Sequence, residues 1–168
     1  MSSFFKGILI LSVLGLMGCS AVRVGGFNPA NLDVDQRVAD GERMAKKFQE
    51  LQRNNVVPSN ILISDMFLPE GLKLNGDQMV VAQGSKHKVL GYFFVNEAPN
   101  LALNNVDAFK LIKQAAGAMG ADFVYLALVS ENIDKVGHTE TYSKTIYYSR
   151  AWGVKLDPKV AKKLRAKK

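Results

Sequence analysis

The segment VDAFKLIKQAAGAMGADFVYLALV (residues 106–129) joins an amphipathic helix to a buried strand, and the rest of the domain can be built outward from it. Apolar residues recur at intervals of three or four between Val106 and Met119, which predicts a helix with one buried face. Asn104 or Asn105 can cap its first turn, and Gly120 can supply the left-handed residue that ends it.

Two strands are predicted after this helix. FVYLALV (123–129) is almost continuously apolar, which is typical of a strand covered on both faces. TIYYSRAWGVKL (145–156) alternates between two faces and predicts a last strand, with the polar segment 130–144 as the hairpin connection between the two. Arg150 interrupts the face that carries Trp152, so we expect it to lie near an edge of the sheet or to pair with another group.

Upstream of this segment, the pattern predicts one more helix and three strands. The helix starts at Asp35 and ends at Asn54-Asn55. The strands are expected at 61–69, 77–84 and 88–96, with a tight turn at Asn75-Gly76 and a hairpin formed by the last two strands around GSKH. This order predicts an α+β fold: a small, mostly antiparallel sheet with helices packed on one face, in a single domain of residues 35–154.

The N-terminus reads as a signal segment of residues 1–18, with Lys6 ahead of an apolar run that is too short to span a bilayer as a helix. Leu16-Met17-Gly18-Cys19 resembles the bacterial lipobox. That resemblance implies attachment of a diacylglyceryl group to the Cys19 thiol through a thioether, cleavage before Cys19, and acylation of the new amino group, for example with palmitate. Two or three such chains give stable membrane anchoring. Ser20, by the same resemblance, favours the outer membrane. We expect the domain to face the periplasm, with exposure at the cell surface as the alternative.

Residues 19–34 contain Gly25-Gly26 and Pro29 and have no periodicity, so we expect a lipidated, flexible tether ahead of the domain. Cys19 is the only cysteine in the chain, which excludes an intramolecular disulfide.

The net charge of +7 is concentrated in residues 155–168, a basic tail, while the body of the chain is neutral. A frayed, solvated terminus is the simplest interpretation of this tail. The alternatives are a contact with anionic lipid or acidic polysaccharide, and covalent attachment to peptidoglycan through Lys168. A nucleic-acid partner is not expected in this compartment.

No arrangement of residues typical of a catalytic site, a phosphate-binding loop or a cofactor site is present, so we expect no enzyme activity and no cofactor. His87 and His138 are the candidate metal ligands, with carboxylates near the second. Those carboxylates are Glu131, Asp134 and Glu140. Neither histidine has a second His or Cys at ligand spacing, and we expect both to lie in solvated turns without a metal.

The aromatic residues near the C-terminus are the best candidates for contact with another protein. Arg150 lies among four aromatic residues in the sequence: Tyr142, Tyr147, Tyr148 and Trp152. Aromatic residues together with arginine are typical of protein interfaces. An equally good interpretation is that half of these aromatic side chains fill the core. We single out Arg150, Trp152 and Tyr148 as candidate partner-binding residues on an exposed edge strand.

From Lys88 onward, the chain resembles a class of small domains that includes the YbjQ-like domains and the outer-membrane lipoprotein sensor of the Rcs envelope-stress pathway. The similar segments are VLGYFFV (89–95), AFKLIKQAAGAMGAD (108–122), FVYLALV (123–129) and AWGV (151–154). The resemblance implies an α+β fold and an envelope role. Together these patterns predict a non-catalytic binding or structural subunit of an envelope assembly, such as a secretion apparatus or a stress pathway. The alternatives are a small-ligand or metal-binding lipoprotein and a peptidoglycan-associated anchor.

Overall fold

The computed structural model describes residues 21–30, 33–136 and 141–166, and the side chains of 135–142 are outside that description. Helices and strands follow one another in the order β1 (Val24–Pro29), α1 (Val34–Arg53), β2 (Leu62–Ser64), β3 (Leu72–Asn75), β4 (Gln78–Val81), β5 (Lys88–Val95), α2 (Pro99–Asn104), α3 (Val106–Met119), β6 (Phe123–Val136), β7 (Thr141–Lys155) and α4 (Pro158–Arg165).

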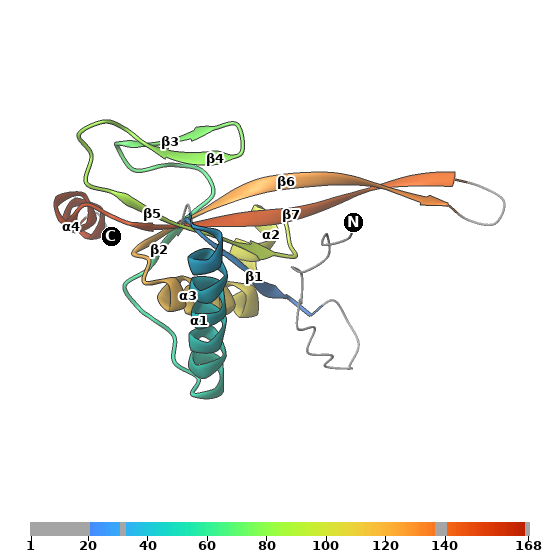
Figure 1. Cartoon of the computed structure of the whole chain (residues 1–168), viewed down its shortest axis with the longest axis horizontal. Coiled ribbons are helices and arrows are strands. Elements are labelled where there is room, and N and C mark those ends of the chain that lie inside the picture. The colour runs from blue at the N-terminus through green and yellow to red at the C-terminus, as the bar shows by residue number, and fades with distance from the viewer. Residues whose placement is uncertain (1–20, 31–32, 137–140, 167–168) are drawn as a thin grey trace.

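The main sheet has five strands in the order β1-β5-β7-β6-β2. Three of its four pairings are antiparallel, and the short strand β2 runs parallel to β6. Helices α1, α2 and α3 lie on one side of this sheet, and the small β3–β4 sheet lies on the other (Figure 1). The predicted α+β class, with a mostly antiparallel sheet and helices packed on one face, is confirmed.

Two apolar clusters flank the sheet because its central strands alternate in the direction of their side chains. The helix face of the sheet, with Phe93, Val95, Val124, Leu126 and Ala151, packs on buried residues of α1 and α3. The hairpin face, which carries Phe123, Trp152 and Val154, packs on Leu72 and Met79 of the β3–β4 sheet and on Ala161 of α4. Phe123 and Val124 are fully buried, so the first part of β6 is covered on both faces, as its apolar run predicts.

Helix α3 matches the sequence pattern closely. The Asn105 side chain caps its first turn by accepting from the backbone N–H groups of Asp107 (3.0 Å) and Ala108 (3.2 Å). Gly120 ends the helix in the left-handed conformation, with φ of 79°. The chain therefore leaves the helix at Gly120 and enters β6 at Phe123.

The expected tether at 19–34 is wrong for residues 24–29, because these form the edge strand β1. Phe27 anchors the strand by packing its ring against Phe48 (5.6 Å between centroids) and Phe93 (5.8 Å). The register shifts between Gly25 and Asn28, which breaks the alternation that would have marked a strand. Residues 19, 20, 31 and 32 lie outside the described part of the chain.

The strand pairing expected around GSKH is also wrong. β4 pairs with β3 across the predicted Asn75-Gly76 turn, in a separate two-stranded sheet, while β5 pairs with β1 and β7. The turn places Gly76 at φ of 61°, a conformation that favours glycine. The strand expected at 61–69 is likewise shorter, since only Leu62–Ser64 pairs with β6.

Three further expectations are corrected in the C-terminal third. The polar connection predicted at 130–144 is largely β structure, since β6 and β7 pair as far as Val136 and Thr141. β7 lies in the middle of the sheet, so it is not the exposed edge strand that we expected. The basic tail is not frayed over its described part: it forms α4, which Asp157 caps and whose Ala161 is buried.

Candidate functional site

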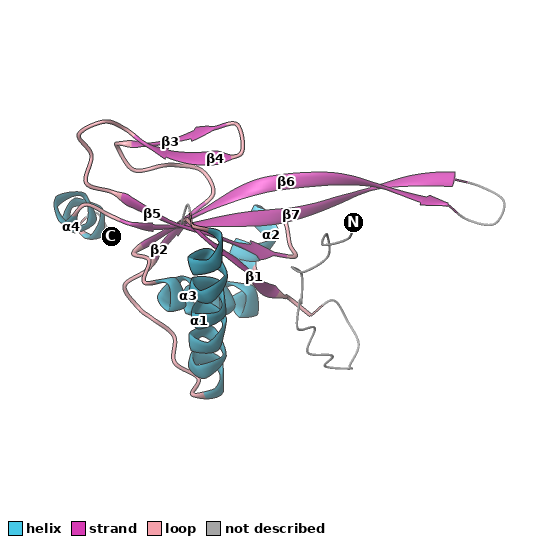
Figure 2. Cartoon of the chain, in the orientation of Figure 1, coloured by secondary structure: helices cyan, strands magenta, loops and turns pink. Residues whose placement is uncertain are grey.

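The most prominent feature of the surface is a two-stranded ribbon that extends from the sheet (Figure 2). The neighbouring strands stop early, because β2 reaches only Tyr125 on β6 and β5 reaches only Ser149 on β7. From Val129 and Tyr148 to Val136 and Thr141, the strands β6 and β7 pair with each other alone. We call this part (residues 129–136 and 141–148) the ribbon. At about 3.4 Å per residue, it is about 24 Å long.

The ribbon has two different faces. On one face, cross-strand hydrogen bonds join Thr145 to Asn132 (2.8 Å) and Ser143 to Asp134. The other face continues the hairpin face of the sheet and is more apolar. It carries Val129, Ile133, Ile146 and Tyr148, together with the charged Glu131 and Lys144. Within the described residues, no strand pairs with the outer edges of the ribbon, so their backbone N–H and C=O groups are available to another strand.

Arg150 lies on the hairpin face of β7, two residues after Tyr148, where the ribbon joins the sheet. Its guanidinium is stacked over the rings of Tyr92 (5.0 Å to the centroid) and Phe94 (6.0 Å). It also donates to the backbone carbonyl (2.8 Å) and the carboxylate (3.0 Å) of Asp77, which follows the Asn75-Gly76 turn. The expectation that Arg150 pairs with another group is confirmed, and its partner connects the β3–β4 sheet to the main sheet.

The charge of Arg150 affects the ionisation of Asp77. The hydrogen bond from Arg150, followed by its positive charge, holds the pKa of the Asp77 carboxyl below its ordinary value. The two side chains differ in environment: Arg150 is 16% exposed, whereas Asp77 is 78% exposed. Solvent therefore screens much of their attraction, and the stacking on Tyr92 and Phe94 contributes to holding the guanidinium in place.

All three candidate partner-binding residues are less accessible than expected, since Arg150 and Tyr148 are half-buried and Trp152 is buried. Trp152 is 7% exposed and packs against Tyr92 (4.9 Å between ring centroids), so it belongs to the core rather than to a contact surface. Arg150 and Tyr148 lie on the same face of β7 as Trp152, as the alternation predicts. Tyr148 is half-buried at the base of the ribbon, with its ring 5.6 Å from that of Phe94. The Tyr142 side chain lies outside the described residues.

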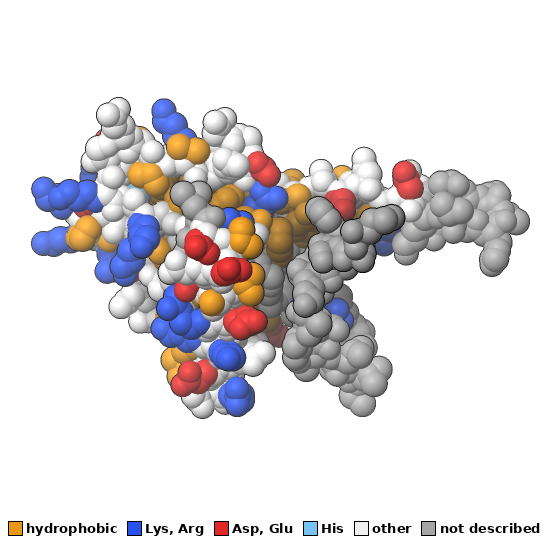
Figure 3. Space-filling view, in the orientation of Figure 1, with side chains coloured by type: hydrophobic (Ala, Val, Ile, Leu, Met, Phe, Trp, Pro, Cys, Tyr) orange, Lys and Arg blue, Asp and Glu red, His pale blue; other side chains and the backbone are white. Residues whose placement is uncertain are grey.

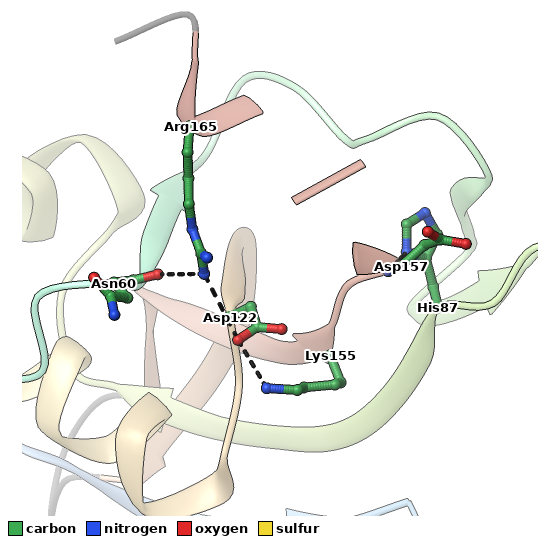
Figure 4. A network of polar contacts seen from close by, with 6 residues as sticks. All are labelled: Asn60, His87, Asp122, Lys155, Asp157 and Arg165. Atoms are coloured by element: carbon green, nitrogen blue, oxygen red, sulfur yellow. Dashed lines mark hydrogen bonds and ion pairs between the residues drawn. The ribbon is translucent and has the colours of Figure 1, made fainter. Parts of the chain in front are cut away.

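His87 is buried and structural, which corrects the expectation of a solvated turn. Its Nε2 lies 2.8 Å from the carbonyl oxygen of Glu70, and its Nδ1 accepts from the backbone N–H of Asp157 (2.9 Å). Both ring nitrogens are therefore engaged, and they join the start of α4 to the loop before β3. Figure 4 shows His87 beside Asp157. His138 and Glu140 lie outside the described residues, within which no metal-binding cluster of His, Cys, Asp or Glu is found.

Helix α4 presents a basic surface at one end of the molecule. The Asp122 carboxylate pairs with Lys155 at the end of β7 (2.9 Å) and lies 3.9 Å from Arg165 at the end of α4 (Figure 4). Lys159, Lys162 and Lys163 are exposed. Basic side chains gather over the end of the molecule where α4 lies (Figure 3).

A surface hollow of about 260 Å³ lies between α1 and α3. Its lining residues are Gln52, Asp107, Lys110, Leu111 and Gln114. The Gln114 side chain is buried and donates to the carbonyl oxygens of Leu51 (3.2 Å) and Val56 (3.0 Å), so it fastens the end of α1 to α3. The Oε1 atom of Gln114 is buried and has no hydrogen-bond partner among the described residues.

Sequence reasoning missed the ribbon and the partner of Arg150. The local signal for the first is weak, because Glu131 interrupts the face that carries Val129 and Ile133. No local signal points to Asp77, which is 73 residues from Arg150. The lipidation candidate Cys19 lies outside the described residues.

Comparison with known proteins finds no family model, no curated protein and no solved structure that matches this chain. Within the described residues, no helix has the length and apolar character needed to cross a membrane.

Proposed function

We propose that the mature protein is an outer-membrane lipoprotein, anchored through Cys19, whose domain is a non-catalytic binding subunit of a cell-envelope assembly such as a secretion apparatus or a stress-sensing pathway. The Leu16-Met17-Gly18-Cys19 motif supports the anchoring. The ribbon supports the binding role, and it is the single observation that carries the proposal.

A ribbon of this kind is suited to contact with another protein. Its outer strand edges have no neighbouring strand within the described residues, so a partner strand can add to either side through main-chain hydrogen bonds. Its apolar face offers Ile146, which is 39% exposed, next to Tyr148. Strand addition supplies affinity, and the side chains of this face supply specificity.

The ribbon can be removed without opening the core. Ser130 pairs with Tyr147, so replacing residues 131–146 by Asn-Gly joins these two positions with a tight turn. We expect crosslinked capture from native envelopes to enrich one envelope complex with the full-length lipoprotein and to lose it with the shortened chain. The matched control, Glu42→Ala with Arg43→Ala on α1, should retain the complex. Cys19→Ala should lose both membrane attachment and the complex.

Retention of the same complex by the shortened chain would contradict a binding role for the ribbon. Recovery of no protein partner, or hydrolysis of cell-wall material by the purified protein, would contradict the binding-subunit proposal as a whole.

A second candidate function rests on α4. Its exposed residues Lys159, Lys162 and Lys163 are suited to an anionic surface such as peptidoglycan or lipid headgroups. If this is the main role, the purified domain sediments with isolated cell-wall sacculi or anionic vesicles at low salt. Replacement of the three lysines by glutamine then abolishes sedimentation, whereas shortening the ribbon has no effect. Lys168, the candidate for covalent attachment, lies outside the described residues.

A further inference from the structure

The chain is bound to the sheet almost immediately after the lipidation motif. The Asn96 side chain donates to the carbonyl oxygen of Ala21 (3.2 Å) and accepts from the backbone N–H of Arg23 (2.6 Å). The backbone N–H of Asn96 donates to the carbonyl oxygen of Arg23 (3.1 Å). These three hydrogen bonds fasten residues 21–23 to the end of β5 before β1 begins.

This arrangement leaves very little chain between lipid and domain. Ala21 is two residues after Cys19, and two residues of fully extended chain span about 7 Å. A lipid on Cys19 would therefore enter its bilayer beside the end of the sheet where Asn96 lies. We call this the anchor end.

Several chain segments meet at the anchor end. β5 ends there at Val95, and α2 and α3 follow it in the chain. The ribbon begins at the same end of the sheet, since Val95 pairs with Ser149, the residue next to Tyr148. In Figure 1 the start of β1, α2 and the ribbon all lie toward the same side of the molecule. Four large apolar side chains at this end are exposed: Leu101 (59%), Val106 (83%), Leu128 (59%) and Tyr147 (55%).

The basic helix lies at the opposite end. Lys88 pairs with Lys155 at the far end of β5, and α4 follows Lys155 within a few residues. The eight residues of β5 separate the two ends by about 24 Å. Figure 1 shows α4 on the side away from the ribbon and the start of β1.

From these contacts we infer that the domain is held in one orientation on its own membrane, with the anchor end against the bilayer and the lysines of α4 facing away from it. The inference rests on the proposed lipidation of Cys19. The exposed apolar side chains of the anchor end contact the lipid, as expected for a patch that no other part of the described chain covers. The ribbon then begins at the membrane surface, and α4 faces the periplasm.

Site-specific quenching tests this orientation directly. Once Cys19 is acylated, a cysteine introduced elsewhere is the only free thiol, so Leu101→Cys and Lys162→Cys can each carry one fluorophore. We expect quenching by spin-labelled phosphatidylcholine in reconstituted vesicles to be several-fold stronger at position 101 than at position 162. Equal quenching at the two positions would overturn the inference.

Two variants test the cause of the orientation. A twelve-residue Gly-Ser insertion between Ser20 and Ala21 leaves the Asn96 contacts intact but lengthens the connection by about 19 Å on average. Asn96→Ala removes both side-chain hydrogen bonds, and Asn100→Ala on α2 is the matched control. We expect the insertion and Asn96→Ala to reduce the difference between positions 101 and 162, and Asn100→Ala to preserve it. If the insertion leaves the difference in quenching unchanged, the short connection between lipid and domain does not control the orientation.

These outcomes separate the inference from the proposed function. Absence of palmitate from the wild-type protein would contradict both the fixed orientation and the proposed lipoprotein function. If the protein incorporates palmitate and fractionates with membranes but is quenched equally at positions 101 and 162, only the fixed orientation is contradicted. Capture of a partner through the ribbon would be unaffected.

Discussion

Arg150 carries a full charge in the middle of a sheet, and its neighbours explain how it is accommodated there. The guanidinium lies over two aromatic rings and reaches Asp77 at the end of its side chain. The rings cover the flat faces of the group, and its Nη1 donates both hydrogen bonds to Asp77. Its Nε is buried and has no partner among the described residues. This residue therefore connects the main sheet to the β3–β4 sheet.

The pairing with Arg150 predicts a particular pH dependence for Asp77→Asn. Because the folded state lowers the pKa of this carboxyl, it favours the ionised form. That stabilisation is present above the carboxyl's unfolded pKa and is lost as the pH falls through the lower, folded value. We expect the variant to be less stable than wild type at neutral pH, with a difference that shrinks in the acid range. Urea unfolding followed by the fluorescence of Trp152, the only tryptophan, measures it.

Glu131→Gln is the control for this measurement, because Glu131 is exposed and forms no ion pair among the described residues. We expect it to change the free energy of unfolding by about 0.5 kcal/mol or less at neutral pH. A difference for Asp77→Asn that stays constant into the acid range would contradict the assignment.

Gly91 is the second residue whose role can be tested individually. Its φ is +128°, and an added Cβ would lie 2.2 Å from the carbonyl oxygen of Asn28 on β1. We expect Gly91→Ala to lower the free energy of unfolding by about 3 kcal/mol or more, since backbone strain and a backbone clash add together. Gly84 also has a positive φ but nothing within 4 Å, so Gly84→Ala should cost about 1 kcal/mol. Equal losses for the two would exclude the clash.

At the scale of single elements, α3 depends on one of two adjacent asparagines for its N-terminal cap. Asn105 accepts from two backbone N–H groups, whereas the Asn104 side chain donates only to the carbonyl oxygen of Asn100 (2.8 Å). We expect Asn105→Ala to destabilise the protein by about 1 kcal/mol and Asn104→Ala by clearly less. Thermal unfolding by circular dichroism distinguishes them, and the reverse ranking would be incompatible with this cap.

Helix α4 depends on a contact that lies outside the helix itself. His87 accepts from the backbone N–H of Asp157, the residue that caps α4. We expect His87→Ala to release the helix locally and to speed trypsin cleavage at Lys159 to Lys163, because protease access follows local opening. Lys73→Ala, on β3, is the control. If the His87→Ala variant is cleaved at Lys159 to Lys163 as slowly as wild type, His87 does not hold α4 in place.

At the scale of the whole molecule, the two ends of the sheet should differ in their importance for stability. No described side chain of the ribbon is buried, so replacing residues 131–146 by Asn-Gly should change the free energy of unfolding by about 1 kcal/mol or less. Truncation after Leu156 removes the buried Ala161 and the donor to His87, and should cost about 2 kcal/mol or more. Chemical denaturation of both chains measures this, and a larger loss from the ribbon would contradict the assignment of the core.

The sequence alone predicted the elements whose signals are local. Helix α3, its cap, its terminal glycine and the buried strand that follows are encoded by periodicities of 3.6 and 2 within a short window. The two faces of β7 followed from the same alternation, so Tyr148, Arg150 and Trp152 were correctly placed on one face. The lipobox resemblance is likewise carried by four consecutive residues, Leu16 to Cys19.

Only the tertiary structure decided which segments are partners and which side chains are buried. Residues 24–29 form a strand because Phe27 packs on two distant rings and β5 provides a free edge, which no local pattern contains. His87 and Trp152 are buried because α4, the β3–β4 sheet and the loop before it cover them. The physical reason is the same in each case. Periodicity records what a segment can form, whereas pairing and burial depend on contacts between residues far apart in the chain, such as Arg150 and Asp77.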